Sequence, residues 1–146
     1  MTCFELNDAI AHLYATLRAP QQIDGHVWYT TDPHLQAFER RVNQMKRYEV
    51  PVEDINYLFM NNCDSVQSAK YYLPRALELI ANGERFINEF MLSMKVQQAG
   101  FQQWPDAERQ AVVRVLLAMK SLAPGTHLDN ILKEFSWALP ASTDSP

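Results

Sequence analysis

The sequence has little glycine, and its four glycines, Gly25, Gly83, Gly100 and Gly125, stand far apart. A phosphate-binding loop needs several glycines within a few positions, so the common nucleotide-binding motifs are excluded. The Gly-x-Ser-x-Gly segment that exposes the nucleophile of many hydrolases is missing as well. Because the sequence holds no recognisable catalytic motif, it predicts a protein that is not an enzyme and needs no cofactor.

Cysteine is also scarce, with Cys3 and Cys63 as the two examples. One pair does not build the disulfide framework of a small secreted domain, so free thiols in a reducing compartment are expected. The first residues show neither the basic nor the apolar region of a secretory signal. No apolar run approaches the roughly 18 residues that cross a bilayer. These absences predict a cytoplasmic protein that does not enter a membrane.

The chain lacks an excess of basic charge, since its formal net charge is −4 and its pI is about 5.5. Proteins that bind duplex nucleic acid draw much of their affinity from neutralised phosphates, so no nucleic-acid partner is expected. A basic cluster does exist at Arg40, Arg41, Lys46 and Arg47, with an acidic residue on either side. A solvated helix face is the better interpretation, and nucleic-acid binding would require this cluster to join a larger basic surface.

The chain is rich in hydrophobic residues, which make up 47% of it and recur at helical spacing. Its 146 residues fit one domain. The prediction is an all-α, compact bundle of six to seven helices over residues 1–139, followed by a disordered tail at 140–146. The expected helices cover residues 6–18, 32–48, a short segment that starts near 53 and stops at 61–62, 64–82, 85–99, 105 to a turn at 124–125, and 126–139.

Pro74 lies inside the expected helix 64–82. Its ring removes one backbone hydrogen bond and clashes with the preceding turn, so we expect a kink or a break near Tyr71–Pro74. Irregular stretches within helices often mark functional sites. The side chains of Tyr71, Tyr72, Arg75 and Glu78 are therefore candidates for lining a ligand pocket at this point.

Two of the expected helices, 85–99 and the one that begins at Pro105, are apolar over a wide arc. Such helices are either central in the bundle or partly used to bind a partner. Core burial is the first interpretation and self-association the second. The expected inner face of helix 85–99 holds Phe86, Ile87, Phe90, Met91 and Met94, with Leu92 and Val96 beside it, while Val113 and Leu117 flank the stripe of the following helix.

Two Asp-x-His units, Asp24-Gly25-His26 and Asp32-Pro33-His34, are the best metal-binding candidates in the sequence. Carboxylate and imidazole groups bind divalent metals, so Asp24, His26, Asp32 and His34 are weak candidate ligands. Spacing alone does not specify a tetrahedral site, and Asp32 already serves as the expected N-cap of a helix. The better interpretation is a loop and a cap with two exposed histidines and no metal.

The segment Tyr71-Tyr72-Leu73-Pro74-Arg75-Ala76-Leu77-Glu78, followed further along by Trp104, Glu108 and Ala111, resembles a pattern in bacterial all-helical proteins of unknown function. The resemblance covers about the middle half of the chain. It implies an all-helical fold and a bacterial origin, and it brings no catalytic residues. By analogy, small acidic members of such groups look like partner-binding proteins, including immunity proteins that inhibit toxins.

Two functional hypotheses follow from these observations. The first is a non-enzymatic protein-interaction domain, either inhibitor-like or self-associating, because wide apolar arcs and mild acidity stand beside the missing catalytic motifs. Its partner would be another protein or a second copy of the chain. The alternative is a small-ligand-binding protein or an enzyme that uses a pocket at the Pro74 kink, with residues 24–34 as a lid.

Overall fold

The computed structural model describes residues 3–18, 33–62 and 66–140 of the chain. Over these residues the chain is helical and has no strand, which confirms the predicted fold class. Short 3₁₀ turns at Arg47–Glu49, Phe101–Gln103 and Ser136–Ala138 and a π turn at Leu58–Asn62 join the main helices. The seven α-helices are α1 (Cys3–Thr16), α2 (Pro33–Asn43), α3 (Val52–Tyr57), α4 (Val66–Ala81), α5 (Glu89–Gln98), α6 (Asp106–Leu122) and α7 (Asp129–Glu134).

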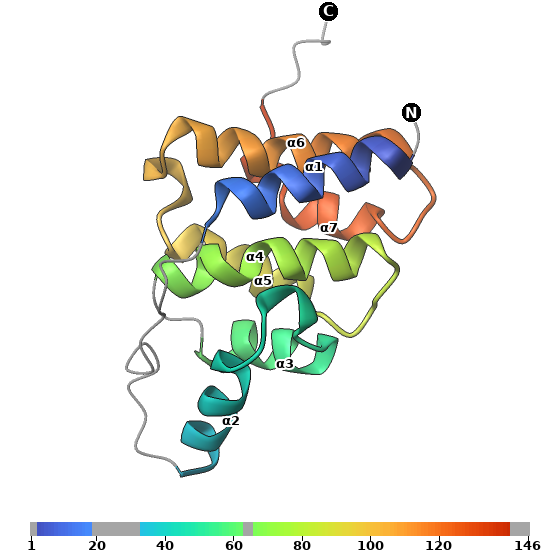
Figure 1. The fold of residues 1–146 in the computed structure, drawn as a ribbon. Helices are drawn as coiled ribbons and strands as arrows, with labels where there is room; N and C mark the ends of the chain where they lie inside the picture. The colour runs from blue at the N-terminus through green and yellow to red at the C-terminus, as the bar shows by residue number, and fades with distance from the viewer. Residues whose placement is uncertain (1–2, 19–32, 63–65, 141–146) are drawn as a thin grey trace, which may run out of the picture.

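Helix α4 lies at the centre of the arrangement, against α1, α3 and α5, while α1 packs along α6 (Figure 1). The apolar faces of these helices meet in one core, where Leu13 of α1, Leu77 of α4 and Leu116 of α6 have no exposed surface. A stripe of apolar residues at a period near 3.6 brings such side chains to one face of each helix. The sequence periodicity therefore accounts for both the helices and their burial.

Of the two expected outcomes at Pro74, a kink or a break, the break is wrong, because helix α4 runs unbroken from Val66 to Ala81. A proline inside a helix costs about 3 kcal/mol relative to alanine. Here the ring is buried, and its neighbours Tyr72, Leu73 and Ala76 are buried with it. The carbonyl of Tyr71, three residues before the proline, accepts a hydrogen bond from Arg47 at 3.0 Å. Packing of the buried ring offsets part of what the proline removes, and the bond from Arg47 adds a tie between α4 and the segment that follows α2.

Helix α2 ends at Asn43 and not near Tyr48 as expected. The chain then turns and forms the 3₁₀ turn Arg47–Glu49. This turn aims Arg47 at α1 and α4, where its guanidinium finds several carbonyl acceptors, whereas a longer α2 would carry it away from them. Helix α2 itself is attached to α3 by contacts that include the two-bond ion pair of Arg41 with Asp54, at 2.6 and 3.0 Å.

Helix α5 begins at Glu89, four residues later than expected, because Asn88 caps it. The Asn88 side chain accepts a hydrogen bond from the backbone N–H of Met91 at 3.0 Å. The buried residues of α5 are Leu92, Ser93 and Val96. The predicted inner positions Phe86 and Phe90 are wrong, since their side chains are 60% and 61% exposed.

The expected helix 126–139 is shorter in the structure, where α7 ends at Glu134 and the 3₁₀ turn Ser136–Ala138 follows. A buried serine on α5 holds this end of the chain. The hydroxyl of Ser93 donates to the carbonyl of Glu134 at 2.7 Å and accepts from Trp137 Nε1 at 2.6 Å. The short helix α3 is followed by the π turn Leu58–Asn62, which reaches the expected stop at Asn61–Asn62.

Several sequence predictions concern residues outside the described ranges. These are Asp24, His26 and Asp32 of the metal candidates, all of the proposed lid but Pro33 and His34, the free thiol of Cys63, and the tail at 141–146. Among the helices that the structure describes, none is long and apolar enough to cross a membrane.

Candidate ligand-binding pocket

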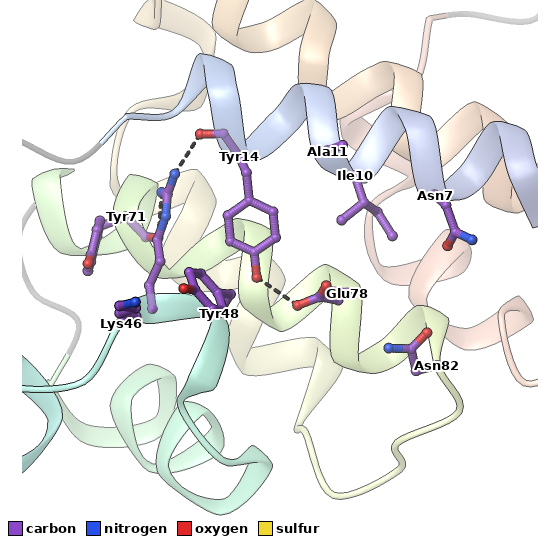
Figure 2. A pocket seen from close by; sticks show the side chains of 10 residues that line it. Asn7, Ile10, Ala11, Tyr14, Lys46, Tyr48, Tyr71, Glu78 and Asn82 are labelled. Atoms are coloured by element: carbon purple, nitrogen blue, oxygen red, sulfur yellow. Dashed lines mark hydrogen bonds between the residues drawn. The ribbon is translucent and has the colours of Figure 1, made fainter.

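An open pocket of about 820 Å³ lies between α1, α4 and the segment 46–48. Figure 2 shows Tyr14 reaching from α1 towards α4, with Lys46, Tyr48 and Tyr71 at one end and Asn7 and Asn82 at the other. Apolar side chains of α1 form the wall between the two ends. Among the described residues, those that line it are Asn7, Ile10, Ala11, Tyr14, Lys46, Arg47, Tyr48, Tyr71, Glu78 and Asn82.

Arg47 joins the three elements that form the pocket. Its guanidinium donates to the carbonyls of Tyr14 and Leu17, both at 2.5 Å, at the end of α1. It also donates to the carbonyl of Tyr71 in α4 at 3.0 Å. The guanidinium carbon lies 4.9 Å from the ring centroid of Tyr14 and 4.9 Å from that of Tyr71, so the cation contacts both aromatic rings.

The charge of Arg47 is stabilised by dipoles. Burial lowers the pKa of Arg47, while the nearby Tyr71 and Tyr14 oppose this shift. An arginine remains protonated in proteins, so the site keeps a fixed positive charge. The last carbonyls of a helix carry partial negative charge, which makes the end of α1 a favourable place for this cation. Because three of its five N–H groups donate to these carbonyls, Arg47 supplies charge to the pocket more than hydrogen bonds.

Glu78 forms the polar floor of the pocket. Its Oε1 accepts from the hydroxyl of Tyr14 at 2.7 Å and from the guanidinium of Arg75 at 2.7 Å. Arg75 is in turn held by the carbonyl of Val50, to which its Nε donates at 2.9 Å. Burial, reinforced by the bond to Glu78, raises the pKa of Tyr14, so its phenol stays protonated and donating. The carboxylate is therefore oriented and largely neutralised by its partners.

The end of the pocket near Tyr48 carries an adjustable positive charge. Lys46 is exposed, and its ammonium lies 5.8 Å from the ring centroid of Tyr48. A lysine side chain has a flexible stem and a compact charge, so this ammonium can turn towards an anion in the pocket. The opposite end offers the neutral amides of Asn7 and Asn82.

The structure brings together three of the four pocket residues predicted from the Pro74 segment. Tyr71 and Glu78 line the pocket, and Arg75 donates a hydrogen bond to Glu78. Tyr72 faces the core, where it is 1% exposed and packs edge-on against Tyr71 with ring centroids 4.8 Å apart. Successive residues on a helix point about 100° apart, which explains why the two adjacent tyrosines differ.

The sequence did not point to Tyr14, Lys46, Arg47 and Tyr48 as pocket residues. The basic cluster expected on a solvated face is divided between two environments, with Arg41 paired to Asp54 and Arg47 turned inward. A half-buried tyrosine at the end of an apolar stripe gave no functional signal, because such residues usually serve the core. No signal in the sequence marks Arg47 as a pocket residue, because the turn after Asn43 is not visible there.

A second, polar pocket of about 470 Å³ lies where the end of α4, the start of α5 and the turn before α7 meet. Glu89 lines it and accepts a hydrogen bond from the amide of Asn130 at 2.8 Å. Its Oε2 is buried, and burial raises the pKa of this carboxyl. His127 and Asp129 also line this pocket. Within the part of the chain that the structure describes, no three His, Cys, Asp or Glu side chains are placed to hold a metal ion, and His34 is exposed on α2.

No family model, no curated protein and no solved structure matches this chain. Function must therefore be inferred from the geometry of the pocket between α1 and α4.

Proposed function

We propose that this chain is a non-enzymatic binding protein whose small-ligand site is the pocket between α1, α4 and residues 46–48. The observation that carries the proposal is the convergence of three tyrosines and a fixed arginine on one open pocket of about 820 Å³. Ligand sites are typically pockets of about 300–1,000 Å³ with mostly apolar walls and a few oriented polar groups. The pocket has both features.

Binding fits the site better than catalysis does. The donors of Arg47 are directed to carbonyls, and Glu78 is held between Arg75 and Tyr14. A general base or nucleophile must be able to reach a reacting atom and change its protonation state. The raised pKa of Tyr14 works against that role near neutral pH. These groups are arranged to position a ligand and not to react with it.

Filling the pocket tests the proposal. Ala11 lines the pocket from α1, and its side chain is exposed, so Ala11→Trp is expected to block the cavity while the fold is retained. Ala15→Trp is the matched control, because Ala15 is exposed on the same helix but does not line the pocket. A small-molecule library is screened by thermal shift, and binders are measured by calorimetry. Binders should lose affinity for Ala11→Trp alone. A library without binders, or binders that tolerate Ala11→Trp, would refute the site.

Protein–protein interaction is the second candidate function, and the exposure of Phe86 and Phe90 favours it. These side chains are 60% and 61% exposed at the start of α5, and large exposed aromatics often mark interaction sites. Light scattering after size-exclusion chromatography should then show self-association that the double substitution Phe86→Ser and Phe90→Ser removes. A wild-type chain that remains monomeric at high concentration and retains no stoichiometric protein partner would end this alternative.

A further inference from the structure

We infer that the pocket selects an apolar monoanion, of the class of aryl and alkyl carboxylates, and binds its anionic group at the Lys46 end. The inference rests on the proposed function, because it concerns the ligand of the same pocket.

The charge of the pocket is opposite to that of the chain. Lys46 and Arg47 line it with two positive charges, and Glu78, the one acidic side chain among the described lining residues, is paired with Arg75 at 2.7 Å. The chain as a whole carries a formal charge of −4. A local positive field in an acidic protein favours an anion in the pocket and disfavours a cation.

The positions of the charges set the orientation of the ligand. Lys46 lies at the end shared with Tyr48 and Tyr71 (Figure 2). Each end lies near the C-terminus of one helix, α1 beside Arg47 and α4 beside Asn82, so the helix dipoles do not distinguish the ends and the cationic side chains do. An anionic group is therefore attracted to the Lys46 end, and a neutral hydrogen-bonding group suits the amides of Asn7 and Asn82.

The donor set fits a single negative charge better than a phosphate. Polyphosphate sites gather several backbone N–H groups at a helix N-terminus or a glycine-rich loop. Among the residues that the structure describes, the lining contains no glycine, and none of its residues on α1 and α4 lies in the first turn of its helix. Arg47 contributes charge, while three of its five N–H groups donate to carbonyls. Lys46 is thus the side chain placed to contact the anion directly.

The body of the ligand is defined by the walls. Ile10 and Ala11 present aliphatic surface from α1, and Tyr14, Tyr48 and Tyr71 present aromatic surface. Offset or edge-to-face aromatic contacts are worth about 0.5–1.5 kcal/mol beyond simple burial. A flat apolar body therefore gains from these walls, and the carboxylate supplies the specificity.

Three probes that share a naphthalene body test the inference: 2-naphthoate, neutral 2-naphthylmethanol and cationic 2-naphthylmethylammonium. Their affinities are measured by calorimetry at low salt for the wild type, Lys46→Gln, Lys133→Gln and Ala11→Trp. Lys133 is the matched control, since it is exposed on α7 and does not line the pocket. We expect naphthoate to bind most tightly and the ammonium probe most weakly. Lys46→Gln should weaken naphthoate by about two- to fivefold, as expected for one exposed charge contact, and leave the alcohol unchanged.

The outcomes separate the inference from the proposed function. If the alcohol binds as tightly as naphthoate, or if Lys46→Gln and Lys133→Gln behave alike, while Ala11→Trp abolishes binding, the pocket stands and its selectivity for an anion is overturned. If Ala11→Trp binds naphthoate as the wild type does, the pocket is not the site and the proposed function fails with the inference. Absence of naphthoate binding at millimolar concentration overturns the inference alone, and the library screen then decides the proposed function.

Discussion

Removing the guanidinium of Arg47 is expected to destabilise the whole domain more than any surface charge does. This side chain connects the end of α1, the Tyr71 turn of α4 and the 3₁₀ turn Arg47–Glu49, although it is only half-buried. Arg47→Met keeps much of the aliphatic stem and deletes three carbonyl contacts and two aromatic contacts. The substitution therefore isolates the contribution of the guanidinium head.

The magnitude follows from the number of contacts and from the access of water. Hydrogen bonds to a charged group contribute about 1.5–3 kcal/mol each, and a cation over an aromatic ring about 0.5–2 kcal/mol. These values do not add, because the contacts share one group and water can reach the carbonyls through the open pocket. A loss of about 3 kcal/mol is expected, which lowers Tm by about 6–12 °C for a domain of this size.

Urea denaturation, followed by circular dichroism at 222 nm, measures this loss as a shift of the midpoint. Arg47→Lys keeps the charge but cannot reach three carbonyls with one ammonium, so roughly half of the loss is expected. The matched control is Arg40→Met on the exposed surface of α2, where a change within about 0.5 kcal/mol is expected. If Arg47→Met costs no more than Arg40→Met, Arg47 does not hold these elements together and the reasoning is refuted.

Three further outcomes are expected from other parts of the fold. Ser93→Ala removes the hydroxyl that links Trp137 Nε1 to the Glu134 carbonyl, so the free energy of unfolding measured in urea should fall by about 1–3 kcal/mol. A decrease under about 0.5 kcal/mol would show that this hydroxyl does not stabilise the C-terminal segment. Gly100 has a φ of 78°, which is unfavourable for alanine, so Gly100→Ala should lower the free energy of unfolding by about 1–2 kcal/mol. An unchanged midpoint of urea denaturation would contradict this left-handed conformation. Glu89 has a pKa raised by burial above its ordinary 4.5, so the folded state retains a proton that the unfolded chain has released. Stability should therefore fall as pH rises from about 4.5 through the raised value, and Glu89→Gln, measured by urea titration across pH 4–8, should lack this slope. If the stability of the wild type and of Glu89→Gln changes with pH in the same way, Glu89 is not the cause of the pH dependence.

The fold class could be predicted from the sequence because helical periodicity is local. Leu6, Ile10 and Leu13 mark the face of α1 whatever lies against it, and they are buried as predicted. The ends of helices depend on single side chains. Asn88 caps α5 through its own oxygen, so the helix begins after Phe86 and not at Arg85, and both Phe86 and Phe90 are exposed. The periodicity of apolar residues does not show which residue caps the helix.

The pocket could be predicted only in the part that one helix contributes. Tyr71, Arg75 and Glu78 lie within two turns of α4, and Pro74 drew attention to them. Tyr14 comes from another helix, and it meets Glu78 across 64 positions of sequence. Arg47 was grouped with its basic neighbours because sequence cannot show that the chain turns after Asn43. Contacts between distant segments, which define the pocket, have no local signature.

The pairing of α1 with α6 has a consequence for synthesis. About ninety residues separate the end of α1 from the start of α6. At roughly 5–20 residues per second, α1 waits about 5–20 s for the helix that covers it. During this interval Leu6, Ile10 and Leu13 lack part of their cover, so the emerging chain offers an apolar stripe to chaperones. Chains truncated before α6 should accordingly be insoluble or bound to chaperones, while the full-length chain folds.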